Sequence, residues 1–110
     1  MTIKEMRNKD VLRLAKTLTT DPTAAEIEKA AKAMRAFYRF SAAYLASFYT
    51  EQSRTATQAQ KAEADNKSEK AYKRAADLLS VYNMRISCPG LYPIIEHTNG
   101  MNFSYGYFYN

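Results

Sequence analysis

The fold is decided by residues 23–49, which read TAAEIEKAAKAMRAFYRFSAAYLASFY and contain neither Gly nor Pro. Apolar side chains recur here at steps of three and four residues, which places them on one broad face of an α-helix. Thr23 and Glu26 have the spacing of a capping box, which marks the start. The pattern predicts one uninterrupted helix with five largely buried side chains: Met34, Phe37, Tyr38, Leu45 and Phe48.

The opposite face of this helix is basic. Four cations lie together there, and two more would extend the row if the helix continued: Lys29, Lys32, Arg35 and Arg39, then Arg54 and Lys61. A run of like charges on a helix is most often a solvated face. The same row also fits a binding surface for an acidic partner, and both interpretations stay open.

Composition bounds the class of protein. The 110 residues suffice for one modest core, and we expect a single domain over 1–110 with a net charge of +5. One Cys excludes an internal disulfide and a zinc site built from several thiolates. Residues 1–20 carry charges throughout, and no segment approaches the roughly 20 apolar residues of a membrane span. We therefore expect a soluble, cytoplasmic protein without a membrane partner.

Two further helices are expected beside the central one. An apolar stripe predicts a first helix that ends near Leu18. Ala, Gln, Lys and Glu keep helix propensity high after Tyr49, so we expect the central helix to continue to about Ala64, with a disordered linker as the alternative. The expected break is at 65–68, followed by a third helix that ends near Arg85. The second and third helices would form a hairpin.

A β-hairpin is expected after the helices. Asn99-Gly100 is the preferred pair for a two-residue type I′ turn, and Pro93 marks its strand as an edge. Pairing across that turn gathers six side chains on one face: Tyr92, Ile94, Met101, Phe103, Tyr105 and Tyr107. Because a lone two-stranded hairpin is marginal in water, this face must pack, either on the helices or on a partner. We favour packing on the helices.

The fold class is therefore mainly α, with a minor β part. We expect a three-helix arrangement with a long central helical hairpin, in a helical body over 1–85, and a C-terminal aromatic β-hairpin over 91–109.

The sequence offers little for catalysis. Cys88 and His97 are the only thiol and imidazole and could approach each other across the loop between them. They are weak evidence for a nucleophile, because Arg85 is the only basic residue near Cys88. Carboxylates are scattered, and every Gly follows residue 85, so neither a metal cluster nor a Gly-rich phosphate loop is expected. We expect a non-enzyme without cofactor or metal.

What remains is a binding protein. We expect it to self-associate, most simply as a dimer, and to engage a macromolecular partner through the basic helix face and the aromatic hairpin. The candidate binding residues are Lys32, Arg35, Arg39, Tyr92, Phe103, Tyr105, Tyr107 and Tyr109. The partner would present an acidic protein surface. Two alternatives stay open: a nucleic-acid-binding protein or small inhibitor of a nucleic-acid machine, and a binder of a small anionic, nucleotide-like ligand.

Gly100 tests the predicted turn, because a β-branched residue is poorly tolerated at positive φ. If the aromatic face packs on the chain's own helices, Gly100→Val lowers the midpoint of thermal unfolding. If the face packs on a partner, assembly falls while the helical circular-dichroism signal is kept. A G100V protein with unchanged melting temperature and unchanged mass in solution would contradict the predicted turn.

Overall fold

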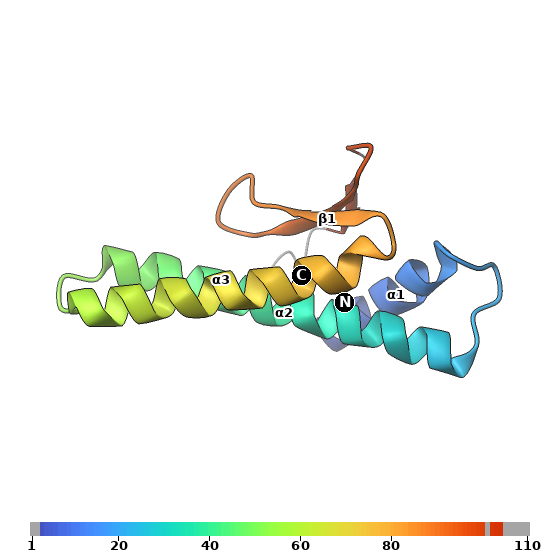
Figure 1. Ribbon diagram of the computed structural model, residues 1–110, viewed down its shortest axis with the longest axis horizontal. Helices are drawn as coiled ribbons and strands as arrows, with labels where there is room; N and C mark the ends of the chain where they lie inside the picture. Colours follow the sequence, from blue (N-terminus) through green and yellow to red (C-terminus); the bar gives the residue numbers. More distant parts are fainter. Residues whose placement is uncertain (1–2, 101, 105–110) are drawn as a thin grey trace.

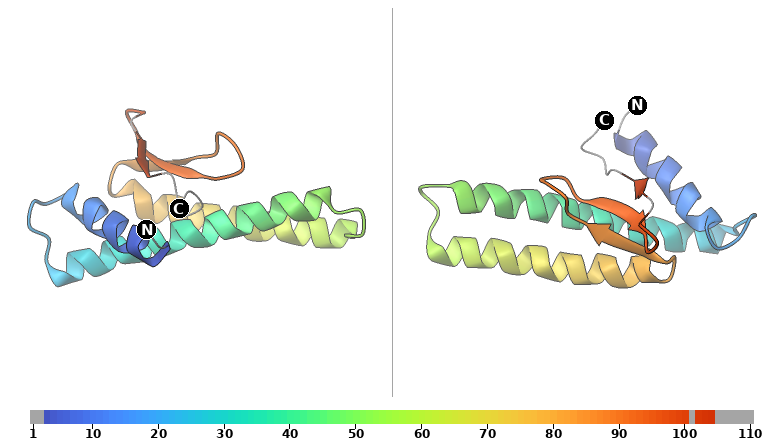
Figure 2. Two further views of the ribbon diagram at one scale, coloured as in Figure 1. Left: turned by 180° about the vertical axis from the view of Figure 1, so that it is seen from behind. Right: turned by 90° about the horizontal axis from the view of Figure 1, so that it is seen from above.

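The computed structural model describes residues 3–100 and 102–104, which form three helices followed by a small sheet. The elements are α1 (Ile3–Lys16), α2 (Ala24–Gln52), α3 (Gln58–Ser80), β1 (Met84–Ser87), β2 (Ile94–His97) and β3 (Asn102–Ser104). α2 and α3 form a long antiparallel hairpin, and α1 and the sheet leave the tip of that hairpin uncovered (Figures 1 and 2). The predicted class, mainly α with a helical hairpin and a C-terminal β-hairpin, is confirmed.

The capping box at Thr23 forms as predicted. The Thr23 hydroxyl accepts a hydrogen bond from the Glu26 N–H at 3.2 Å, and the Thr23 N–H donates to the Glu26 carboxylate at 2.9 Å. These bonds from Thr23 hold the pKa of Glu26 below its usual value. The two side chains thereby satisfy backbone donors that the first turn of a helix leaves unpaired.

The predicted continuation of the central helix to Ala64 is wrong, and so is the predicted break at 65–68. α2 ends at Gln52, and α3 begins after Thr57, whose hydroxyl accepts from the Gln60 N–H at 3.1 Å. The Gln60 side chain closes this second capping box by accepting from the Thr57 N–H at 2.8 Å. Since the chain turns here, α3 packs along α2 instead of starting beyond a polar extension.

The core lies where the helices and the sheet meet. Leu14, Phe37, Leu79 and Ile95 come from four different elements and are all fully buried. A polar pair joins α1 to α2 beside them: the buried Tyr38 hydroxyl donates to the buried Asp10 carboxylate at 3.0 Å.

Burial along α2 follows the prediction only in its first half. Met34, Phe37 and Tyr38 are buried, whereas Leu45 is half-buried. Phe48 is 43% exposed, so its predicted burial is wrong. The physical reason is that Phe48 lies in the last two turns of α2, where the core cluster no longer continues.

The third helix ends at Ser80, not near Arg85 as predicted. Asn83 has a φ of 57°, a left-handed conformation that Asn tolerates, and it turns the chain toward β1. Met84 and Ile86 are buried in β1 with exposed Arg85 between them, which is the alternation of a strand. The helical spacing of Ile86 with the apolar residues of α3 had predicted this short strand as the last turn of a helix.

β2 is the central strand of an antiparallel sheet with the order β1-β2-β3, so the predicted edge position of its strand is wrong. Pro93 precedes Ile94, the first paired residue of β2. Its missing N–H therefore removes no hydrogen bond from the ladder.

The turn between β2 and β3 keeps the predicted glycine but not the predicted type. Gly100 has a φ of 94° and donates its N–H to the His97 carbonyl at 2.8 Å. Asn99 is not at positive φ, so the turn is not type I′. Ile95 pairs with Ser104 in the predicted register, but a bulge follows and Glu96 pairs with Asn102 instead of its predicted partner.

Phe103 packs on the helical body, as favoured from the sequence. It is buried, and the Arg13 guanidinium of α1 lies 4.5 Å from the centre of its ring. The cluster that contains Phe103 includes Ile95, whereas Ile94 is buried outside that cluster. The predicted single face is therefore wrong for Ile94 and Phe103. Met101, Tyr105 and Tyr107 lie outside the described residues.

Phe37 should carry much of the stability of this core, because it is fully buried at the centre of α2. Phe37→Ala is expected to lower the free energy of unfolding by about 3–5 kcal/mol. Leu45→Ala is the matched control and should cost less, about 1–2 kcal/mol, because Leu45 is only half-buried. Urea unfolding followed by circular dichroism measures both. Equal costs would contradict the placement of the core.

Candidate functional site

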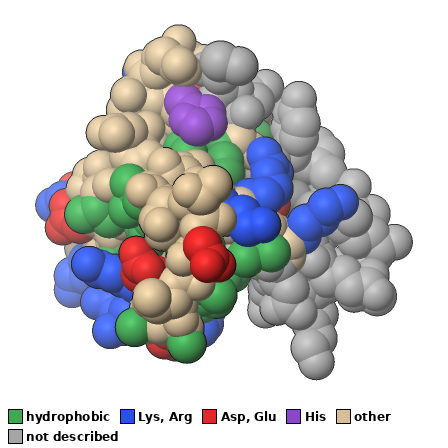
Figure 3. All heavy atoms as spheres, turned by 90° about the vertical axis from the view of Figure 1, so that its right-hand side faces the viewer, with side chains coloured by type: hydrophobic (Ala, Val, Ile, Leu, Met, Phe, Trp, Pro, Cys, Tyr) green, Lys and Arg blue, Asp and Glu red, His purple; other side chains and the backbone are tan. Residues whose placement is uncertain are grey.

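The predicted basic residues form an exposed row on α2, defined here as the basic row: Lys32, Arg35 and Arg39. Their steps of three and four residues keep them on one helix face. Arg35 pairs with Glu28 at 2.8 Å, and both side chains are largely exposed. Within the described residues, Lys32 and Arg39 form no ion pair. Lys and Arg side chains are prominent on the end of the molecule drawn in Figure 3.

The basic row does not extend to Arg54 and Lys61, because α2 ends at Gln52. The same face of α2 instead continues into small residues, at Ala42 and Ala46. These begin an open groove of about 780 Å³ between the two helices at the tip, called the tip groove. Its lining consists of Ala42, Ala43, Ala46, Tyr49, Thr50, Ser53, Thr55, Ala56, Gln60, Glu63, Ala64 and Lys67.

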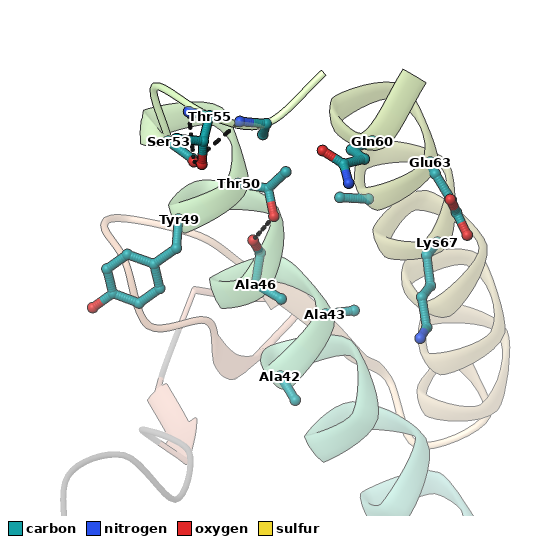
Figure 4. Close-up of a pocket in the computed structure, with 12 residues that line it drawn as sticks. Ala42, Ala43, Ala46, Tyr49, Thr50, Ser53, Thr55, Gln60, Glu63 and Lys67 are labelled. Atoms are coloured by element: carbon teal, nitrogen blue, oxygen red, sulfur yellow. Dashed lines mark hydrogen bonds between the residues drawn. The ribbon is translucent and has the colours of Figure 1, made fainter. Parts of the chain in front are cut away.

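Polar side chains surround the alanines of the tip groove (Figure 4). The Thr50 hydroxyl donates to the Ala46 carbonyl at 2.8 Å, and the Ser53 hydroxyl accepts from the backbone of the α2–α3 turn. Glu63 and Lys67 stand on α3 across from the alanines of α2. Neither forms an ion pair with another described residue.

A second groove of about 470 Å³ lies elsewhere on the hairpin, beside the loop after β1. It is called the aromatic groove, and its lining consists of Phe40, Tyr44, Ser47, Phe48, Glu51, Asp65, Ser68, Glu69, Tyr72 and Cys88. The Phe40 ring is in contact with those of Tyr44 and Tyr72, with ring centres 5.6 and 5.4 Å away. The Tyr44 hydroxyl donates to the Gly90 carbonyl at 3.4 Å, which links this wall to the loop between β1 and β2.

The aromatic groove contains functional candidates that the sequence analysis missed. Glu51, Asp65 and Glu69 looked scattered along the chain, yet they line one groove. They meet because the chain reverses at 53–57, a turn that the sequence analysis placed further along. The Thr-x-x-Gln spacing of Thr57 and Gln60 was the available signal.

The predicted aromatic binding residues are not assembled as a surface in the described part of the chain. Tyr92 is half-buried, and Phe103 is buried against Arg13. A ring in that position cannot stack on a base, and Arg13 was not among the predicted residues. The three remaining candidates, Tyr105, Tyr107 and Tyr109, lie outside the described residues.

Cys88 and His97 do not form a nucleophile–base pair. His97 is opposite Met84 at one end of the β1–β2 ladder, whereas Cys88 follows Ser87 at the other end. Four residues of strand separate them, which is about 13 Å. Partial burial raises the pKa of the exposed Cys88 thiol, which keeps the thiol protonated at neutral pH. Among the described residues, no group of three His, Cys, Asp or Glu side chains is placed to hold a metal.

Comparison of the chain with protein-family models, with curated proteins and with solved structures finds no match. Within the described ranges, none of the three helices has both the length and the apolar character of a membrane span.

Cys88 alkylation tests the protonated thiol. Because the thiolate is the reactive form, and the folded pKa lies above the ordinary value of 9.0, iodoacetamide should react slowly at pH 7. The alkylation rate of the folded protein should still rise with pH above 9. In urea, the alkylation rate of the unfolded protein should reach its plateau at a lower pH. A folded-state rate that is already at its plateau at pH 8 would show an activated thiolate instead.

Proposed function

We propose that this chain is a non-enzymatic interaction protein that self-associates through the tip groove and binds an acidic protein surface through the basic row. The observation that carries the proposal is the continuity of one face of α2: the exposed row Lys32, Arg35 and Arg39 runs directly into Ala42 and Ala46 of the tip groove. One side of the helical hairpin thus offers a charged surface and an adjoining concave surface. Separate arguments support each half.

The basic row is suited to a partner with opposite charge. Lys32 and Arg39 have no described counter-ion, and only Arg35 is paired, with exposed Glu28. Exposed pairs of this kind are weak, so Arg35 can exchange its partner at little cost. Complementary potentials of this type accelerate encounter and select partners, with a modest effect on affinity.

The tip groove is suited to a second copy of the chain. Its alanines allow close approach of a helix, and Tyr49, which is 59% exposed, supplies an aromatic side chain at the rim. In a twofold dimer, each contact between a residue of one copy and a different residue of the other copy occurs twice, once in each direction. Glu63 of one copy could then pair with Lys67 of the other, and the reverse pair would form by symmetry. Their lack of described partners within one chain supports this arrangement.

Binding of an acidic surface by the basic row is tested by measuring the fluorescence anisotropy of a fluorescein-labelled hexaglutamate peptide. Lys32→Gln with Arg39→Gln should weaken the dissociation constant about tenfold, which is about 1.4 kcal/mol. Lys70→Gln with Arg74→Gln is the control: it removes the same charge from exposed positions on α3 and should change the dissociation constant less than about twofold. If both double variants lost affinity for the peptide equally, only the net charge of the chain would matter, and the position of the basic row would not. Tighter binding of single-stranded DNA than of the peptide would favour a nucleic-acid partner instead.

The self-association half is tested by sedimentation over a range of concentrations. The wild-type chain should reach the mass of a dimer, and Ala46→Lys should weaken dimerisation at least about tenfold, since it places a bulky charge on the groove. Ala62→Lys makes the same change at an exposed position of α3 outside the groove and should leave the dimer intact. A wild-type monomer at millimolar concentration would refute the dimer.

A further inference from the structure

We propose that the aromatic groove is a second binding surface, which takes a lysine or arginine side chain from a basic segment of another protein. This goes beyond the proposed function and does not depend on it, because the aromatic groove shares no lining residue with the tip groove or the basic row. The occupant follows from the charge, the rings and one hydroxyl acceptor in the groove.

The charge of the aromatic groove is opposite to that of the chain. The formal net charge is +5, yet the ionisable carboxylates that line the groove are Glu51, Asp65 and Glu69, with no Lys or Arg in the lining. Glu69 pairs with Lys73 at 3.6 Å, and both side chains are about two-thirds exposed or more. Glu51 and Asp65 form no ion pair with a described residue. The groove therefore attracts cations, although the chain as a whole carries a net positive charge.

The rings of the groove are suited to the same cation. Phe48 and Tyr72 are 43% and 41% exposed, and Phe40 and Tyr44 pack behind them. An ammonium or guanidinium group is attracted to the face of such a ring, most strongly where water is excluded. Its alkyl stem would cover apolar ring surface that is now in contact with water.

The side chain of Ser68 adds a hydroxyl acceptor to the wall of the groove. Ser68 is 8% exposed and lines the groove between Asp65 and Tyr72 on α3. Its hydroxyl forms no hydrogen bond with a described residue, whereas neighbouring Ser47 donates to Asp65 at 2.5 Å. An ammonium group has only donors, so it would satisfy the Ser68 oxygen and the free carboxylate oxygens together.

A second copy of this chain is a poorer occupant. On α2 the basic row and the residues of the aromatic groove, such as Phe40 and Tyr44, lie on different sides of the helix. Pairing one with the other between copies would be head-to-tail and would not close on a twofold axis. A basic segment of a different protein has no such constraint.

The test uses fluorescein-labelled hexalysine and the full chain, with anisotropy at low salt. Because the chain is basic overall, saturable binding of hexalysine is expected only at the acidic groove. Asp65→Asn with Glu69→Gln should weaken the dissociation constant at least about tenfold. Asp21→Asn with Asp77→Asn makes the same charge change at exposed positions outside both grooves and should shift the dissociation constant less than about twofold. Thermal melts show whether each variant is folded.

Tyr72→Leu separates ring attraction from simple charge. It keeps an apolar side chain and all carboxylates, and it should weaken hexalysine binding about threefold or more, since the cation loses a ring face. Ser68→Ala should also weaken binding. The proposal is overturned if wild-type protein shows no saturable binding, or if the two acidic double variants lose affinity equally. It is also overturned if sedimentation shows a wild-type assembly that D65N/E69Q dissociates, because the occupant would then be a second copy.

Discussion

The packing of α3 back along α2 is the constraint on which the rest of the structure depends. Small residues make it possible: Ala30 and Ala33 of α2 and Ala75 of α3 are almost completely buried, which lets the two helices approach closely around Phe37 and Leu79. The capping box at Thr57 fixes where the reversal occurs. That position determines which residues of α3 face which residues of α2, and therefore creates both grooves.

The sequence predicted well those features that depend on local chemistry. The capping box at Thr23 and the apolar stripe through Phe37 each lie within a few helical turns, and both formed as expected. The positive φ of Gly100 is likewise a local property. Ends of elements were predicted less well. Helix propensity alone does not distinguish a helix that continues past Gln52 from two helices with a short turn, because Ala, Gln and Lys favour both.

The candidate site was predictable only where its residues share one helix. Lys32, Arg35 and Arg39 are exposed together because their spacing along α2 requires it. Glu51 and Asp65 come from two helices, and their proximity depends on the position of the turn between them. A one-residue bulge in β2–β3 pairing had a similar effect on the tail, where it separated Ile94 from Phe103. Contacts between elements are set by tertiary geometry that periodicity does not encode.

A basic row and an acidic groove on one small chain create a risk of open-ended association between copies, and two ion pairs reduce that risk. A basic row that met an acidic groove of another copy would continue from copy to copy without closing. Two features weaken that contact. Glu28 pairs with Arg35 within the basic row, and Lys73 pairs with Glu69 at the edge of the aromatic groove. Each exposed pair contributes little to folding stability, but each lowers the charge that a second copy would encounter. Under the proposed functions, a partner with a denser charge than this chain would displace either pair, whereas a second copy would meet the reduced charge.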